Sequence, residues 1–359
     1  MAERIYLRPT AFVDAPFGYD GRVARLAGGL AWFSAVEIDV IEGKRRVSTE
    51  LVPVETMGDV VERLGEPVRT AWINLTTARP PLTLGPRVIR LDQPQVMGIL
   101  NVTPDSFSDG GRNEGTAAET AHAMATQGAA IIDIGGESTR PGAEPVWEGD
   151  EIERVLPVVR QLAVSGTALS IDTRKAAVME AALAVGPAVF NDVSGLLYDP
   201  RSMDVAARSG CPVVLMHYQG APETMQVAPH YDGPVLFEVY DWLEARVAAA
   251  VAAGIDRANI IVDPGIGFGK SVAHNLQLMN GLALFHGLGC PLLLGASRKR
   301  MIGALSNEAP ADQRLGGSLT LAVKAAEQGA QILRVHDVAE TVQALRVWRG
   351  LRDAALTPA

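Results

Sequence analysis

The sequence predicts a (β/α)8 barrel, that is a TIM barrel, with an additional small α/β region at its N-terminus. Two observations predict the barrel: eight short aliphatic runs that end in polar or glycine residues, and Ala-rich segments with helical periodicity between them. The third observation is length, because this alternation covers about 260 of the 359 residues, the usual size of such a barrel. A doubly wound open sheet is the alternative, but it would carry a G-x-G-x-x-G turn after its first strand, and none follows Asn101.

The eight aliphatic runs are expected to be strands buried on both faces, because uninterrupted aliphatic stretches are typical of parallel sheets. These runs are 96–101, 130–135, 169–173, 189–193, 213–217, 260–263, 292–296 and 332–336. The intervening helices are expected at segments such as 116–127, 176–184, 236–253 and 315–328. The predicted barrel domain is therefore 95–350, and 351–359 is expected to be a C-terminal tail.

Residues 1–94 lack this rhythm and predict a separate mixed α/β extension. Residues 35–41 alternate like a surface strand, 57–64 suit a short helix, and the prolines within 77–86 are typical of a connection. Because no part of the extension has the spacing of a catalytic motif, we expect it to have a structural or interface role.

Composition excludes several classes of protein. With 48% apolar residues, 20% charged residues and a net charge of -9, the chain is not suited to wholesale binding of nucleic acid or anionic membrane, so an anionic ligand needs a local basic cluster. Two cysteines cannot build a disulfide framework. The first residues lack the hydrophobic core of a signal peptide, so we expect a cytoplasmic protein. The apolar stretch 276–296 is too interrupted by polar residues and a Gly-Cys-Pro break to be a membrane span.

Polar side chains end every predicted strand, at the barrel end where active sites lie. They are Asn101, Glu137 to Arg140, Asp172, Asn191 with Asp192, His217, Asp263, Ser297 to Lys299, and Arg334 with His336. Some polar strand ends serve only structural hydrogen bonds, and for His217 ligand contact and support of a neighbouring loop stay equally open.

Grouped by chemistry, these side chains indicate a ligand with two different parts. Carboxylates, an amide and a cation match the edge of a heterocycle with a 2-amino group and a ring carbonyl; they are Asp172, Asn191, Asp263 and Lys299. Arginines, a histidine and an amide suit a phosphate or pyrophosphate; they are Arg140, Arg334, His336 and Asn101.

The stretch DPGIGFGKS (263–271) is similar to a P-loop. However, Pro264 stands where the G-x-x-x-x-G-K-[ST] motif requires its first glycine, which disfavours an NTPase. We instead expect a tight loop that lets Asp263 and Phe268 approach a flat ligand.

Seven motifs, in family order, together resemble the dihydropteroate synthase family and cover nearly all of residues 95–350. They are MGILNVTPDSFSDGG (97–111), DIGGESTRPG (133–142), SIDT (170–173), NDVSG (191–195), DPG with GFGK (263–270), SRK (297–299) and RVHD (334–337). The resemblance implies a (β/α)8 transferase of folate biosynthesis, which joins 6-hydroxymethyl-7,8-dihydropterin pyrophosphate to 4-aminobenzoate and releases 7,8-dihydropteroate and pyrophosphate. It also implies Mg2+ as cofactor, a homodimer, these small-molecule substrates as partners, and sulfonamides as inhibitors.

The resemblance also implies roles for single residues. The pterin positions are Asp172, Asn191, Asp263 and Lys299, and Met216 and Phe268 are expected to line that pocket. The pyrophosphate positions are Thr139, Arg334 and His336, with Asn101 on Mg2+. The aminobenzoate positions are Phe107, Arg140 and Ser297. The residues expected to take part in catalysis are Asn101, Phe107, Asp109, Thr139, Arg140 and Lys299.

The predicted chemistry is an SN1-like displacement. An arylamine is a neutral nucleophile at pH 7, so departure of the charged pyrophosphate is the harder part of the reaction, and the electron-rich dihydropterin can delocalise the developing cation. The loops that carry Phe107 with Asp109 and Thr139 with Arg140 are expected to exclude water.

A pterin-binding barrel without this activity is the competing hypothesis. Methyltetrahydrofolate methyltransferase domains share the pterin arrangement, but they would lack the loop with Phe107 and Asp109 and the end formed by Arg334 and His336. Both features are present. A non-catalytic pterin binder stays open, because motifs alone do not prove turnover.

Overall fold

The computed structural model describes residues 3–103, 113–138, 145–220 and 225–357, and it confirms the predicted barrel. Eight parallel strands form one sheet in the order β12-β11-β10-β9-β8-β7-β14-β13, and an isolated bridge from Val262 to Leu292 brings its two ends together. The strands are β7 (Gln95–Asn101), β8 (Ile131–Gly135), β9 (Leu169–Asp172), β10 (Ala188–Asp192), β11 (Val213–Met216), β12 (Ile260–Asp263), β13 (Leu293–Leu294) and β14 (Ile332–Val335).

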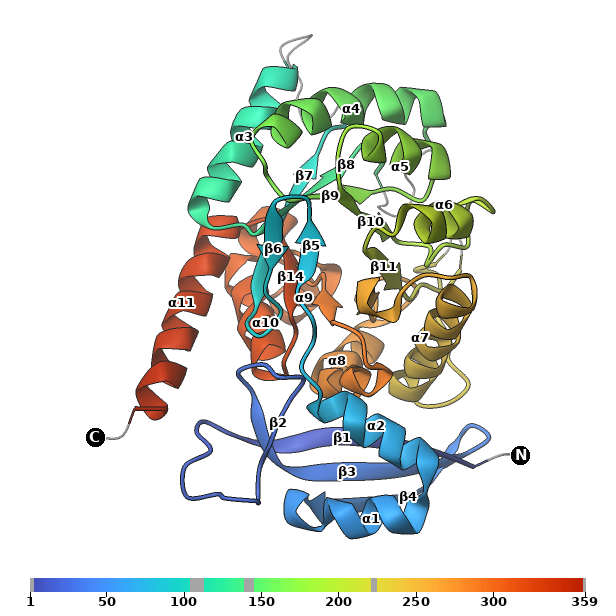
Figure 1. Cartoon of the computed structure of the whole chain (residues 1–359), viewed down its shortest axis with the longest axis vertical. Helices are drawn as coiled ribbons and strands as arrows, with labels where there is room; N and C mark the ends of the chain where they lie inside the picture. Colours follow the sequence, from blue (N-terminus) through green and yellow to red (C-terminus); the bar gives the residue numbers. More distant parts are fainter. Residues whose placement is uncertain (1–2, 104–112, 139–144, 221–224, 358–359) are drawn as a thin grey trace.

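Helices surround the barrel, as Figure 1 shows. They are α3 (Asn113–Gln127), α4 (Glu148–Val164), α5 (Ala176–Leu183), α6 (Ser202–Ser209), α7 (Val235–Ala252), α8 (Val272–Asn280), α9 (Arg300–Leu305), α10 (Leu315–Glu327) and α11 (Val338–Ala355). Most predicted runs agree with the observed strands to within a residue or two. The run 292–296 yields only the two-residue β13, because the chain turns there and Lys299 N–H donates to the Ala296 carbonyl.

A hairpin closes the N-terminal end of the barrel. It consists of β5 (Leu82–Leu84) and β6 (Arg87–Ile89), which pair antiparallel. Its buried leucines pack against residues near the N-terminal ends of the barrel strands, including Met97 and Ile131. The prediction of a plain connection over 77–86 is therefore wrong in its second half, since the alternating Leu-Thr-Leu finds its apolar partner only once the barrel has formed.

The N-terminal domain is a four-stranded antiparallel sheet with two helices on one face. Its strands are β1 (Glu3–Val13), β2 (Ala24–Arg25), β3 (Trp32–Glu42) and β4 (Arg45–Pro53), and its helices are α1 (Met57–Leu64) and α2 (Glu66–Thr76). The bounds of α1 are those predicted. Residues 35–41 were expected to form a surface strand, but β3 is central, and both Val36 and Asp39 are buried because both faces of the sheet are covered.

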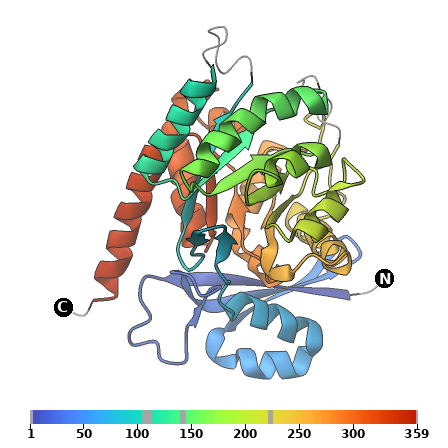
Figure 2. The same cartoon turned by 45° about the horizontal axis from the view of Figure 1, so that its top comes forward.

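This domain docks against the flank of the barrel, as the two views in Figures 1 and 2 show. Tyr6 of β1 packs on Phe237 and Tyr240 of α7, with ring centroids 4.5 and 5.5 Å away. Arg79, which is buried, donates to the carbonyls of His286 and Cys290 across the junction at 2.9 and 3.2 Å. The two parts therefore share buried polar and aromatic contacts.

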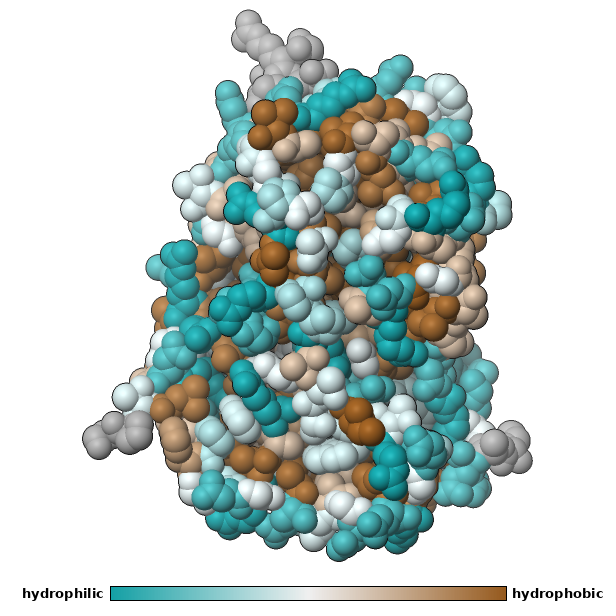
Figure 3. All heavy atoms as spheres, in the orientation of Figure 1, coloured by the Kyte–Doolittle hydropathy of each residue, from teal (hydrophilic) through white to brown (hydrophobic). Residues whose placement is uncertain are grey.

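The surface shown in Figure 3 intersperses hydrophobic residues with hydrophilic ones over both parts of the chain. Within the described ranges, no helix has the length and apolar character needed to cross a membrane. Both cysteines are free and buried.

Candidate active site

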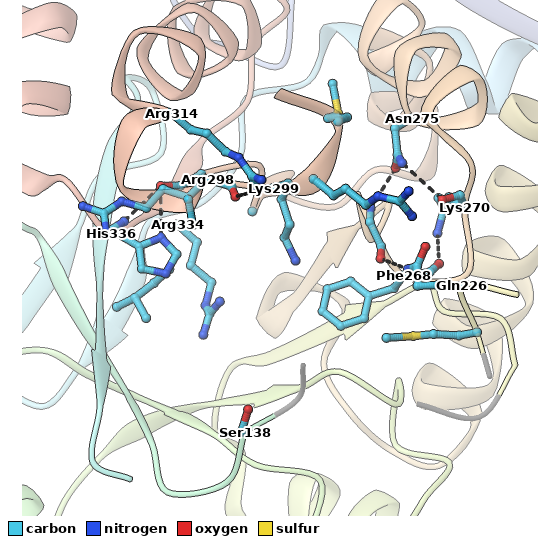
Figure 4. A pocket seen from close by; sticks show the side chains of 18 of the residues that line it. Ser138, Gln226, Phe268, Lys270, Asn275, Arg298, Lys299, Arg314, Arg334 and His336 are labelled. Atoms are coloured by element: carbon cyan, nitrogen blue, oxygen red, sulfur yellow. Dashed lines mark hydrogen bonds between the residues drawn. The ribbon is translucent and has the colours of Figure 1, made fainter. Parts of the chain in front are cut away.

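A cavity of about 1040 Å³ opens at the C-terminal ends of the barrel strands. Its lining comes from strand ends that are far apart in the sequence, and Figure 4 shows Lys299, Arg334 and His336 there together with Phe268. The sequence-predicted residues that line it are Asn101, Asp172, Phe268, Ser297, Lys299, Arg334 and His336. The barrel thus brings many of the predicted strand-end side chains into one cavity, whereas Asn191, Asp192, His217 and Asp263 do not line it.

Arg334 links the floor of the cavity to two carboxylates. Its Nε lies 2.6 Å from Asp133 Oδ2, and its Nη2 lies 2.5 Å from Asp172 Oδ2. Burial alone would lower the pKa of Arg334, but the two carboxylates outweigh burial and raise it. Arg334 is therefore a fixed cation. Its ion pair with Asp172 links a residue predicted to bind a phosphate with one predicted to bind a heterocycle.

Asp172 keeps one oxygen free. Its Oδ1 is buried and has no hydrogen-bond partner among the described residues, whereas Oδ2 accepts from Arg334. Burial raises the pKa of Asp172 to about 7, with Arg334 opposing that rise. A buried acceptor without a partner is costly, so this oxygen is suited to a donor on a bound molecule.

Asp263 is the second buried carboxylate of the site. Its Oδ1 accepts the N–H of Gly265 at 2.7 Å, and burial raises its pKa to about 6. A Cβ at the lining residue Gly295 would stand 3.8 Å from Asp263 Oδ2, so the missing side chain leaves that oxygen next to the cavity.

Lys299 lies over the ring of Phe268, with Nζ 4.0 Å from the ring centroid. Burial, and then the charge of Arg334, lower the pKa of Lys299 to about 8, against the attraction of Asp263 and Asp172. The pair presents a cation and a flat apolar surface side by side, which suits a flat polar heterocycle.

Phe268 belongs to a loop that we call the glycine loop, residues 265–270. Gly265, Gly267 and Gly269 have φ values of +66°, +85° and +63°, and a Cβ on Gly265 or Gly269 would overlap the backbone of His217 or Gln219. This tight winding explains why glycine recurs here without forming a P-loop.

Lys270 closes the glycine loop from inside. Its buried Nζ lies 2.8 Å from His217 Nδ1 and 2.9 Å from the carbonyl oxygens of both Gly265 and Phe268. Burial lowers the pKa of Lys270 to about 7 and that of His217 well below its ordinary value. His217 thus supports the loop, which is the structural one of its two predicted roles.

His336 and Ser297 stand together at the other side of the cavity. His336 Nδ1 lies 3.1 Å from Ser297 Oγ, and the His336 backbone N–H donates to the same oxygen. Burial and then the charge of Arg334 lower the pKa of His336 to about 4, so the imidazole is neutral near pH 7.

Of the remaining predicted residues, two are buried more deeply, Asn101 lines the cavity, and four lie outside the described ranges. Asn191 is buried and donates to both oxygens of Asp133 at 3.2 Å, and Met216 is buried at the end of β11. Asn101 lines the cavity; a Cβ on Gly135 would lie 3.6 Å from Asp172 Oδ2 and 3.7 Å from Asn101 Oδ1, which places these two side chains beside the same glycine. Phe107, Asp109, Thr139 and Arg140 lie outside the residues that the structure describes.

Strand-end reasoning missed two buried charged residues. Asp133 lies inside the aliphatic run Ile131–Gly135, where an ionisable side chain in the middle of a buried strand and its place at the start of the DIGGESTRPG motif were the signals. Lys270 occurs in the GFGK motif, but its partners are backbone carbonyls that depend on how the loop folds.

Taken together, the cavity can bind a flat heterocycle and an anion next to each other. Asp172 and Asp263 offer acceptors, Lys299 and Phe268 offer a cation over a ring, and Arg334 adds a second cation. Asn101 lines the cavity, and the described residues contain no group of three or more His, Cys, Asp or Glu suited to a metal.

Residues 97–336 match the sequence profile of the family described as "Pterin binding enzyme". The dihydropteroate synthase of Escherichia coli strain K12 is 50% identical over 260 residues, which cover 72% of this chain and 91% of that protein.

Solved structures agree with this. Yersinia pestis dihydropteroate synthase in complex with a sulfonamide drug has a TM-score of 0.72 and 48% identity, covering 76% of this chain and 99% of that one. Xanthomonas albilineans dihydropteroate synthase with 4-aminobenzoic acid has a TM-score of 0.72 and 46% identity, covering 78% of this chain and all of that one.

Proposed function

The chain belongs to the dihydropteroate synthase family of pterin-binding enzymes, and we propose that its cavity binds the pterin and the pyrophosphate of its substrate on the two groups of side chains described above. Its activity is that of this family: a transferase of folate biosynthesis, which joins 6-hydroxymethyl-7,8-dihydropterin pyrophosphate to 4-aminobenzoate. The observation that carries the proposal is the free oxygen of Asp172 beside Arg334, within a cavity that also holds Lys299 and Phe268.

For the pterin, the proposal uses the buried acceptors and the stacked cation. Asp172 Oδ1 and Asp263 accept from the amino and ring N–H groups, while Lys299 donates to the ring carbonyl and Phe268 lies against the heterocycle. Asn191 holds Asp133, which in turn holds Arg334. Met216 contributes apolar contact below the ring.

For the leaving group, the proposal uses Arg334 and the neutral His336. Arg334 is a fixed cation at the cavity floor, and contacts to the pyrophosphate that strengthen as its charge develops lower the barrier to departure. Ser297 is proposed to face the carboxylate of 4-aminobenzoate, and Phe107, Asp109, Thr139 and Arg140 are proposed to act from the two loops. The displacement is proposed to be SN1-like.

The residues present fit Mg2+ in one way. Mg2+ is commonly bound through one or two protein oxygens together with substrate phosphates and water. Asn101 lines the cavity beside the same glycine as Asp172 and is the proposed protein ligand. When bound, Mg2+ would neutralise charge on the pyrophosphate. We also propose that the enzyme is a homodimer of the cytoplasm and that sulfonamides compete with 4-aminobenzoate. Residues 1–94 are proposed to have a structural or interface role beside the catalytic barrel 95–350, with 351–359 as its tail.

Formation of dihydropteroate from both substrates by the purified chain tests the activity. Pterin binding without product would instead indicate a non-catalytic pterin binder. For the mechanism, slow release of pyrophosphate from the pterin substrate in the absence of 4-aminobenzoate is expected, because a cationic intermediate does not need the amine to form. A rate that depends strictly on the nucleophilicity of substituted arylamines would contradict the SN1-like step.

The assigned pterin contacts have their own test. Asp263→Asn and Lys299→Ala should each weaken pterin binding at least about tenfold in calorimetry, because each loses a charged hydrogen-bond group. Their circular dichroism spectra should match the wild type. Unchanged pterin affinity in either variant would remove that residue from the site.

A further inference from the structure

The segment Met225–Pro234, which we call the bracing segment, leads from the cavity to the start of α7. Its first residues, including Met225, Gln226 and Pro229, line the cavity. The Gln226 side chain donates to the carbonyl of Gly267, and the Tyr231 hydroxyl donates to the carbonyl of Gly269 at 3.1 Å. The segment therefore holds the glycine loop from its outer side.

These three side chains fix four of the six carbonyls of the glycine loop. Lys270 binds those of Gly265 and Phe268 from inside, while Gln226 and Tyr231 bind those of Gly267 and Gly269 from outside. The loop is not part of a helix or strand, so these donors set where Phe268 lies beneath Lys299 and where the Gly265 N–H meets Asp263. A shift of the loop would move both contacts at once.

Tyr231 is suited to a fixed donor role. Burial raises the pKa of its hydroxyl, so that it stays protonated at neutral pH. Its ring is held edge-on by His274, with centroids 4.9 Å apart, and lies 6.2 Å from the ring of His217. The hydroxyl therefore has little freedom other than toward Gly269.

The N-terminal domain contacts the far end of the bracing segment through the turn between β3 and β4. The Lys44 carbonyl lies so close to Gly233 that a Cβ there would stand 2.9 Å from it. Lys44 Nζ lies 3.4 Å from Glu238, whose carboxylate also accepts the N–H of Gly233, and 3.9 Å from Asp232. Because the family match begins at residue 97, this turn lies outside the shared barrel.

A second contact holds α7 behind the bracing segment. The hydroxyl of Tyr6 donates to Asp241 at 2.7 Å, and Arg4 lies 2.7 Å from Glu244. The N-terminal sheet thus contacts α7 at Asp241 and Glu244, in the first half of the helix.

We infer that Tyr231 is a positioning residue for the pterin side of the active site, and that the turn at Gly43 and Lys44 fixes the segment that carries it. This rests on the proposed function, in which the glycine loop binds the pterin. It gives the N-terminal domain a role in substrate affinity in addition to its role in packing.

Tyr231→Phe in the full chain tests the first half. It keeps the ring and removes only the donor to Gly269, so KM for the pterin substrate should rise about five- to thirtyfold, the range for one lost buried hydrogen bond. We expect kcat within about twofold and KM for 4-aminobenzoate unchanged. A purely structural role would instead lower the melting temperature and the active fraction, leaving both KM values as they are; that outcome would overturn the inference.

Lys44→Glu tests the second half, with Arg45→Glu at the next position, the first residue of β4, as a control. Lys44→Glu places a negative charge beside Asp232 and Glu238, whereas Arg45 is exposed and has no ion pair among the described residues. Lys44→Glu should raise KM for the pterin substrate about two- to fivefold, and much less when Tyr231→Phe is already present; Arg45→Glu should change nothing. Equal effects of the two charge reversals would refute a role for the turn.

Calorimetric pterin affinity separates this inference from the proposed function. If the wild type binds pterin but makes no dihydropteroate, the proposed activity is refuted. The pterin affinities of the same variants would still test the positioning role. Wild-type pterin affinity in Tyr231→Phe would refute that role whatever the activity.

Discussion

Asp133 is a single buried carboxylate on which Arg334, a cavity residue, and the deeper Asn191 both depend. It accepts from Arg334 Nε at 2.6 Å and from Asn191 Nδ2 at 3.2 Å, and it is fully buried. A charge in such a place is tolerated only when paired, and removing one partner of a buried pair leaves the other uncompensated. Asp133 therefore acts through Arg334 and Asn191.

Asp133→Asn is expected to be costly for both stability and function. It leaves Arg334 with Asp172 as its one remaining carboxylate partner among the described residues, so we expect about 3 kcal/mol of destabilisation in urea unfolding. The kcat/KM for the pterin substrate should also fall. The control is Asp353→Asn, which removes the same group from the exposed pair with Arg349 on α11 and should leave both quantities unchanged. Similar unfolding curves for the two variants would contradict this account.

For single residues, the sequence predicts those whose role follows from their place at the end of a strand. Asp172, Asn191 and Asp263 could be selected because they end buried strands, where a barrel has its site. Asp133 could not, because it lies in the middle of a strand and its importance depends on Arg334, about 200 residues later. The donors that hold the glycine loop were equally hidden, since their acceptors are backbone carbonyls.

Among the elements, the glycine loop makes the sharpest demand on residue type. Gly265 has φ of +66° and donates its N–H to Asp263, and a side chain there would overlap the carbonyl oxygen of His217. Gly210 at the end of α6 has nearly the same φ, +64°, but open space around it. The two positions differ in crowding and not in backbone strain.

Gly265→Ala is expected to weaken pterin binding more than tenfold, because the loop must move away from Asp263 to make room. Gly210→Ala carries only the backbone cost, about 1 kcal/mol, and should bind pterin normally. Calorimetry with a pterin and urea unfolding measure the two effects separately. If Gly265→Ala bound like Gly210→Ala, the N–H contact to Asp263 would have no part in recognition.

The elements that the sequence predicts well are those whose pattern is local. The barrel strands are continuous aliphatic runs, and α1 is a short amphipathic helix, so the bounds of α1 and of most barrel strands agree with the structure. The hairpin at Leu82–Leu84 and the central place of β3 depend on surfaces formed elsewhere in the chain. No local pattern carries that information.

For the whole molecule, charge distribution matters more than net charge. The chain is acidic at -9, yet among the described residues of the cavity Lys and Arg outnumber Asp and Glu; the cations are Lys270, Arg298, Lys299, Arg300, Arg314 and Arg334. A concave basic site in an acidic protein attracts a pyrophosphate without binding polyanions over its whole surface. The composition indicated this need for a local cluster, and the barrel supplies it.

The junction of the two parts contains a buried histidine beside a buried arginine. Arg79 donates to the carbonyl of His286, and His286 Nε2 lies 3.0 Å from the carbonyl of Gln328. Burial, and then the charge of Arg79, lower the pKa of His286 from 6.5 to about 3. Protonating His286 would place two cations together at the centre of the docked interface.

This predicts acid sensitivity that belongs to the junction. Between pH 6.5 and 3 the unfolded chain binds a proton that folded His286 does not, so the free energy of unfolding must fall as pH falls through that window. From pH 7 to pH 5 the contribution is about 2 kcal/mol. His286→Gln keeps a donor for Gln328 but cannot titrate, and the other titrating groups are common to both proteins. Urea unfolding at pH 7 and pH 5 should therefore show that the free energy of unfolding falls by about 2 kcal/mol more in the wild type than in the variant. Equal falls in the two proteins would mean that protonation of His286 does not weaken the docking of the N-terminal domain.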